Sequence, residues 1–316
     1  MAAQTHEHSK DHAHSHGGNH SHGHGHSHTH DGIDWTTQIG NLRRGDALGA
    51  ASAARIAERL IGALRKDEPT VLDIGAGAGG QSAAFARELA RAGGGRLVIV
   101  DAVPELLEVA RETAIAALDG DHGVRVEIVR ADAAADGLGE LVPEADLVWA
   151  SRMVHHLPDQ QAGTDSFARL LRPGGWLALS EGGLPTRCLP WDLGVGEPGL
   201  QDRLLTAWEG VFVAMREEIT GAVRMPYGWT TTLRRAGLTE VASFSVLTDH
   251  PAPTSPEVRE HVTSWLDAMR TRVEDVLSDS DRAAIDALLD PAADTYVGTR
   301  DDLFVLGAST IYIGRR

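Results

Sequence analysis

The sequence predicts an α/β fold: a seven-stranded, mostly parallel sheet with helices on both faces and helical inserts after the fifth and sixth strands. Short apolar runs alternate with longer amphipathic segments over residues 70–181, as in successive β-α-β units. The composition fits a globular protein, since 42% of the 316 residues are hydrophobic. After residue 181 the alternation breaks, and a Gly/Pro-rich segment (182–199) begins.

The elements follow from local patterns, taken in chain order. Asp46 is predicted to cap a first helix that runs to about Lys66. Glycine-rich linkers at 91–95 and 172–175 supply helix stops. We expect strands at 70–74, 96–100, 124–129, 145–150, 175–181, 240–248 and 303–314. Further helices are expected at 80–92, 103–118, 160–171, 200–218 and 228–236, and a helical insert at about 257–289.

Residues 1–34 differ from the rest, because they hold 11 of the 16 histidines among Gly, Ser and Asp. A segment with so little to bury is predicted to be disordered, and order is expected from about residue 35. Neutral imidazole binds divalent zinc, nickel and copper, so the tail is predicted to bind such a metal weakly. The candidate ligands are His20, His22, His24, His26 and His28.

Charge and composition exclude several kinds of partner. The net charge of −16 and the lack of a basic cluster argue against nucleic acid. No apolar run of membrane-spanning length occurs, which argues against a membrane partner. The single cysteine, Cys188, cannot form an intramolecular disulfide; this fits a cytoplasmic location, and we expect a buried structural thiol there. The sequence predicts no oligomeric state.

The stretch VLDIGAGAGG (71–80) indicates a cofactor site. Gly75, Gly77 and Gly80 satisfy the dinucleotide pattern G-x-G-x-x-G, and the stretch also approaches a phosphate loop. Gln81 stands where a phosphate loop has its lysine, which argues against a nucleoside triphosphate. Asp73 would repel a diphosphate at the glycine turn but attract the cationic groups of S-adenosylmethionine (SAM). The charge of Asp73 therefore favours SAM over NAD.

Three later segments complete the pattern. Asp101 ends the second strand, where an acid can accept both ribose hydroxyls of SAM or of NAD. Asp132 follows the third strand, and ADLVWASRMVHHLPD (145–159) precedes LLRPGGWLALSEGG (170–183). As an ordered set, these motifs resemble class I SAM-dependent methyltransferases, in particular the small-molecule group that includes ubiquinone and menaquinone methyltransferases. The resemblance covers about residues 70–183 and returns in the last strand.

The resemblance implies a Rossmann-like domain over residues 35–316, with the last strand antiparallel and inserts at about 184–230 and 250–302 forming a lid over the methyl acceptor. It implies SAM as the cofactor and a small, fairly apolar acceptor. The methionine part would contact Gly75, Gly77 and Gly79, and Asp73 would reach its ammonium group. The remaining cofactor positions would be Asp101 at the ribose, Ala102, Asp132 and Ala133 at the adenine, and Ser151 at the sulfonium.

His155 and His156 follow the fourth strand, at the rim of the expected acceptor pocket. Either could remove a proton from an acceptor, or serve only to position the cofactor. Glu181 is a second pocket candidate, and Trp191, Trp208, Phe212 and Met215 are candidates for an apolar lid. No metal site is expected in the folded domain. The alternatives are a metal-handling protein that uses its tail, a SAM-binding regulator and an NAD-dependent oxidoreductase.

Overall fold

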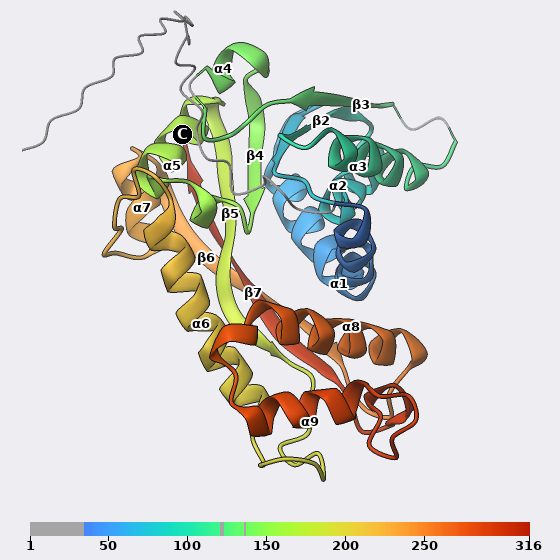
Figure 1. The fold of residues 1–316 in the computed structure, drawn as a ribbon. Coiled ribbons are helices and arrows are strands. Elements are labelled where there is room, and N and C mark those ends of the chain that lie inside the picture. The colour runs from blue at the N-terminus through green and yellow to red at the C-terminus, as the bar shows by residue number, and fades with distance from the viewer. Residues whose placement is uncertain (1–34, 121–122, 136) are drawn as a thin grey trace, which may run out of the picture.

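The computed structural model describes residues 35–120, 123–135 and 137–316. Seven strands form one sheet in the order β3-β2-β1-β4-β5-β7-β6 (Figure 1). The first five strands pair in parallel, and β7 pairs antiparallel with both β5 and β6. The predicted mostly parallel sheet with an antiparallel last strand is therefore confirmed. The strands are β1 (Thr70–Ile74), β2 (Gly95–Asp101), β3 (Val124–Arg130), β4 (Ala145–Ser151), β5 (Leu171–Arg187), β6 (Thr239–His250) and β7 (Val305–Arg315).

Helices connect the strands as the sequence predicts, with the two inserts after β5 and β6. The α-helices are α1 (Trp35–Ala63), α2 (Gly80–Arg91), α3 (Pro104–Ala116), α4 (Leu138–Leu141), α5 (Gln160–Arg169), α6 (Leu200–Glu218), α7 (Trp229–Arg235), α8 (Pro256–Arg272) and α9 (Asp279–Leu289). Short 3-10 helices occur at η1 (Val154–His156), η2 (Glu274–Val276) and η3 (Val297–Thr299).

Each face of the sheet carries its own helical layer, because successive side chains of a strand point to opposite sides. In β1, Val71 packs with the α1–α3 layer around Phe85, whereas Leu72 and Ile74 pack with the α4, α5 and α7 layer around Phe167. All five side chains are essentially inaccessible to solvent. Burial on both faces explains why the parallel strands read as continuous apolar runs.

A third core lies beyond the parallel sheet. β5 is 17 residues long, and with β6 and β7 it extends to a lobe formed by α6, α8 and α9 (Figure 1). Side chains from the end of β5, from the inserts and from the start of β7 fill this lobe, among them Cys188, Leu204, Leu266, Leu288 and Val305. The inserts are thus packed around an apolar centre of their own.

One predicted helix start is wrong, and one insert is divided in two. The first helix begins before Asp46, so this residue does not cap it; instead the Asp46 carboxylate accepts a hydrogen bond from the Gly80 N–H (3.0 Å), in the first turn of α2. The helical insert expected at about 257–289 consists of two helices, α8 and α9. Ser278 begins α9 by accepting a hydrogen bond from the Asp281 N–H (3.1 Å), a side-chain cap that the sequence analysis missed.

Candidate functional site

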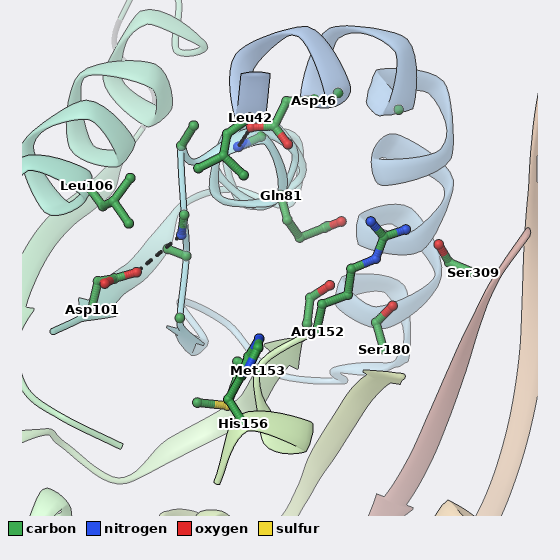
Figure 2. Close-up of a pocket in the computed structure, with 18 of the residues that line it drawn as sticks. Leu42, Asp46, Gln81, Asp101, Leu106, Arg152, Met153, His156, Ser180 and Ser309 are labelled. Carbon is green, nitrogen blue, oxygen red and sulfur yellow. Dashed lines mark hydrogen bonds between the residues drawn. The ribbon is translucent and has the colours of Figure 1, made fainter. Parts of the chain in front are cut away.

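A cavity of about 910 Å³ opens at the carboxyl-terminal ends of β1, β2 and β4 and beside the segment after β3 (Figure 2). Helix α1 borders it on one side, and residues of α8 and of the β5–β7 extension border it on the other. In open α/β sheets this is the edge at which ligands bind. Of the predicted cofactor residues, the cavity is lined by Asp73, Gly75, Gly77, Asp101, Ala102, Asp132, Ala133 and Ser151.

The glycine turn between β1 and α2 adopts a backbone that favours glycine, with φ of 72° at Gly75, 57° at Gly77 and 86° at Gly79. A methyl group added at Gly77 would meet nothing within 4 Å, because this residue faces the open cavity. One added at Gly79 would lie 2.5 Å from the Ala110 Cα of α3. Gly79 does not line the cavity and packs closely against α3, so its predicted cofactor contact stays a prediction.

Asp73 and Asp101 lie at the ends of adjacent strands, and both are buried. Asp73 accepts a hydrogen bond from the Ser82 hydroxyl of α2. Asp101 accepts from the Gly77 N–H (3.3 Å) and the Val103 N–H (3.0 Å), so one carboxylate fixes both the glycine turn and the start of α3. Figure 2 shows Asp101 bonded to the glycine turn. A carboxylate has lone pairs left over to accept from a ligand hydroxyl.

The carboxylates around the glycine turn resist ionisation. Burial raises the pKa of Asp73 from 3.8 to about 7; the charges of Asp101 and Asp46 raise it further, and the Ser82 hydroxyl opposes the shift. Burial also raises the pKa of Asp46 to about 6, although the Gly80 N–H and the charge of Arg152 oppose this shift. A cation placed in this part of the cavity would relieve the repulsion between these groups.

The segment after β3 forms the far end of the cavity. Asp132 accepts a hydrogen bond from the Ala134 N–H (2.8 Å) in a local turn, which presents Ala133 beside it. Ala102 lies next to Asp101, and Leu106 of α3 adds an apolar surface there. The end near β2 and β3 thus combines carboxylates with small or apolar groups, a surface suited to a ribose and a flat base.

The two histidines after β4 have different environments. His156 lines the cavity, whereas His155 does not. The His155 Nδ1 donates to the buried Glu181 carboxylate (2.7 Å), which also accepts from the Met153 N–H (3.2 Å) and the Val154 N–H (2.9 Å). Glu181 does not line the cavity; it holds the turn after β4. The structure therefore leaves His156 as the histidine that can face a ligand.

Helix α6 is attached to the same turn. Arg216 donates to the backbone oxygens of His155 and Leu157, both at 2.7 Å. The Phe212 ring packs edge-on against the His155 ring, with centroids 5.5 Å apart. The first insert thus fixes the position of the residues that follow β4.

The side chains predicted to form an apolar lid do not line the cavity. Trp191 is 71% exposed, and Trp208, Phe212 and Met215 do not line the cavity. Phe212 packs on His155, and Trp208 packs within the lobe, so these apolar side chains of α6 pack against other parts of the protein and not into the cavity. The cavity wall on this side is supplied mainly by α8, the end of α6 and the extended strands; it includes His261, Trp265, Arg272, Ile219 and Leu184.

Other sequence-based expectations concern metal, thiol and membrane. Cys188 is buried as predicted, and burial raises its thiol pKa to about 12, which keeps it protonated. No cluster of three or more His, Cys, Asp or Glu side chains able to hold a metal occurs in the part of the chain that the structure describes. No helix within that part is long and apolar enough to cross a membrane. The histidine tail (1–34) lies outside the described residues.

The strand order, the glycine turn and the carboxylates define an α/β domain of the nucleotide-cofactor-binding type. A family model described as "Methyltransferase domain" matches residues 72–177. A ubiquinone biosynthesis O-methyltransferase from Xylella fastidiosa (strain M23) is 37% identical over 110 residues, which cover 35% of this chain and 40% of the relative. One from Xanthomonas axonopodis pv. citri is 36% identical over 35% of this chain and 41% of the relative. Residues 72–177 belong to the class I SAM-dependent methyltransferase family.

The alignment therefore spans about two fifths of these relatives' length. Among solved structures, the YcgJ protein of Bacillus subtilis has a TM-score of 0.45 at 20% identity, covering 84% of this chain and 99% of that one. A phosphoethanolamine N-methyltransferase of Haemonchus contortus has a TM-score of 0.39 at 17% identity, covering 83% and 52%. With TM-scores this low, the family assignment depends on the sequence matches.

Proposed function

We propose that this protein binds SAM and transfers its methyl group to a small molecule. The observation that carries the proposal is the group of three carboxylates at the glycine turn, the buried Asp73 and Asp101 and the half-buried Asp46, in a cavity at the ligand-binding edge of the sheet. These groups disfavour a diphosphate and favour a cation. The family assignment of residues 72–177 supports the same cofactor.

Each cofactor position has a chemically suitable partner. Asp101 would accept hydrogen bonds from the ribose hydroxyls, and Asp132 with its neighbours Ala133 and Ala102 would adjoin the adenine. The backbone at Gly75 and at Gly77, where an added Cβ would meet open space only at Gly77, would lie along the methionine part, with the Asp73 carboxylate toward its ammonium group. Ser151, at the end of β4, would face the sulfonium.

SAM supplies a methyl carbon already activated by the attached sulfonium, so the protein needs no nucleophile of its own. The protein's residues would align the acceptor with that carbon and exclude water, effects worth up to about 7–11 kcal/mol in model reactions. His156 lines the cavity and is the better candidate to accept a proton from an acceptor hydroxyl or amine. His155, bonded to Glu181, positions the turn that carries His156.

A small acceptor, in place of a polymer, is favoured by the shape of the site. The two inserts and the extended strands contribute Leu184, Ile219 and Trp265 to the wall, so this protein's own lobe borders the space beside the proposed cofactor site. We include in this proposal that the inserts form the acceptor lid, that the acceptor is partly apolar and that the protein acts in the cytoplasm.

Calorimetric titration with S-adenosylhomocysteine (SAH) and, separately, with NAD tests the cofactor. We expect SAH to bind with a micromolar dissociation constant, on the order of −8 kcal/mol, and NAD to bind at least 100-fold more weakly. Tight NAD binding with none of SAH would contradict the proposal. Methyl transfer from radiolabelled SAM to a mixture of small phenols and amines, with RNA and protein as controls, tests the acceptor class.

A further inference from the structure

Arg152 is a cationic residue of the cavity that the sequence analysis overlooked. It follows Ser151 at the end of β4, and its side chain lines the cavity. Its backbone φ is 52°, a left-handed conformation that is rare for a residue other than glycine. The Arg152 N–H donates to the Ser180 carbonyl oxygen (2.9 Å), which holds the strained backbone against β5. Such strain persists where the surrounding structure imposes it, often at functional sites.

The guanidinium of Arg152 is available to a ligand. Within the described ranges it has no hydrogen-bond or ion-pair partner, and the residue is solvent-exposed inside the open cavity. Figure 2 shows its side chain pointing to the side of the cavity that carries Gln81, Ser180 and Ser309, away from Asp101. The positive charge of Arg152 acts to lower the pKa of Asp46, but the Asp46 carboxylate accepts its hydrogen bond from the Gly80 N–H and not from Arg152.

Most acidic and basic side chains of the cavity wall come from different elements. The carboxylates belong to the glycine turn, to the ends of β2 and β3, and to Asp46. The basic groups Arg152, His156, His261 and Arg272 come from the segment after β4 and from α8; a further one, Arg44 of α1, is paired with Glu260. A cofactor held at the acidic end would therefore leave a basic region facing the acceptor.

We propose that the methyl acceptor carries an anionic group, a carboxylate or a phosphate, and that Arg152 binds it. This inference rests on the proposed function and names the substrate class of the same site. A guanidinium presents two parallel N–H donors that match a carboxylate or phosphate, and such pairs are roughly twice as strong as neutral hydrogen bonds. The hydroxyls of Ser180 and Ser309 lie on the same side of the cavity and can add donors to the bound anion.

The test compares ligands and variants on the SAH complex, by calorimetry and ligand-observed NMR. The probes are benzoate and phenyl phosphate, with neutral benzamide as their matched control. We expect one of the two anions to bind at least tenfold more tightly than benzamide, and the tighter one identifies the acceptor's anionic group. Arg152→Met should remove this tenfold preference, whereas Arg125→Met, at an exposed arginine on β3, should keep it.

The variant Arg152→Gly shows whether a lost anion preference reflects the missing guanidinium or a misfolded protein. Glycine accepts a φ of 52° without strain, so this variant should unfold at the same temperature as the unsubstituted protein or higher, while losing the anion preference. Benzamide binding as tightly as both anions, or an anion preference retained by Arg152→Met and Arg152→Gly, would overturn the inference while leaving the cofactor proposal intact.

The affinity for SAH separates the remaining outcomes. We expect its dissociation constant to change less than threefold in both Arg152 variants. A tenfold or larger loss of SAH affinity would instead assign Arg152 to the carboxylate of the cofactor's methionine part, and would overturn its role toward the acceptor. Failure of the unsubstituted protein to bind SAH would remove the proposed function, and this inference with it.

Discussion

The half of the molecule built on β1–β4 and the half built on β5–β7 with the inserts meet in one cavity, but they are constructed differently. In the first half, short strands end at the cavity, and turn backbone and acidic side chains form its wall. In the second, long strands continue past the parallel sheet into a lobe with its own core. The family match ends at residue 177, near this division. In the proposed function the first half would bind the cofactor, and most of the other half lies outside the family match.

The largest expected effect concerns the glycine turn of the first half. Gly79→Ala brings a methyl group to 2.5 Å from the Ala110 Cα at a φ of 86°, and should lower the free energy of unfolding by about 3 kcal/mol. Gly77→Ala has open space, and should lower it by only about 1 kcal/mol through its positive φ, while weakening SAH binding. Urea unfolding measures both. Equal losses would show that Gly79 has no special packing role.

A second prediction concerns the carboxylate that joins two turns of the cofactor half. Asp101→Ala removes the acceptor for the Gly77 and Val103 N–H groups as well as the proposed ribose contact. It should weaken SAH binding at least 100-fold, about 2.7 kcal/mol. Glu112→Gln, on the exposed side of α3, serves as the control in the same calorimetric titration and should have no effect. If Asp101→Ala kept its affinity for SAH, cofactor binding would not depend on this carboxylate of the half built on β1–β4.

The third prediction tests the boundary between the halves. Glu181→Gln replaces with a neutral amide the carboxylate that accepts hydrogen bonds from the Met153 N–H, the Val154 N–H and the His155 ring. The free energy of unfolding should therefore fall by about 2 kcal/mol. SAH affinity should change less than threefold, because Glu181 does not line the cavity. Urea unfolding and calorimetry report the two effects separately. A large loss of SAH affinity with normal stability would instead indicate that Glu181 takes part directly in cofactor binding.

The smallest expected effect is a pH dependence of cofactor binding. Asp73 has a pKa of about 7 in the ligand-free protein, and a cationic ligand favours its ionised form. The affinity for SAM should therefore fall by up to about tenfold from pH 8 to pH 6. Asp46 titrates lower, with a pKa of about 6, so Asp73→Asn should remove most of the change above pH 6.5. Calorimetry at half-unit intervals measures it, and an unchanged profile in Asp73→Asn would exclude Asp73 as the cause.

The raised pKa of Asp73 also determines whether the stability of the ligand-free protein rises or falls with pH. The folded pKa of Asp73 exceeds its usual value of 3.8, so between about pH 4 and pH 7 the folded protein holds a proton that the unfolded chain releases. The contribution of this residue to stability declines as the pH rises through that window and is constant above it. Asp73→Asn should flatten the decline seen in urea unfolding.

The fold was predictable because its signals are local. Most strands contain a short apolar run, and each strand was expected at its observed place to within a few residues, except that β5 extends several residues further at both ends. Asp73, Asp101 and Asp132 were found as site candidates because parallel strands bring their carboxyl ends to one edge.

What the sequence did not predict depends on contacts between distant segments. Asp46 looked like a cap for its own helix, but its partner is Gly80, 34 residues away. Trp208 and Phe212 formed a convincing apolar stripe, yet the surface that receives them is the interior of the lobe and His155. Arg152 did carry a signal, since it is a charged residue directly after an apolar strand, as is Asp101. Its conformation could not be foreseen from its neighbours.

The hydrogen bond from Gly80 to Asp46 has a consequence for defining a minimal unit of this protein. The family segment starts at residue 72, but the first turn of α2 is completed by a side chain from α1. Shortening the chain from its amino end past residue 46 would leave that N–H group without its acceptor and remove one wall of the cleft. Any fragment meant to retain ligand binding therefore has to start upstream of α1's midpoint, well outside the region by which relatives are recognised.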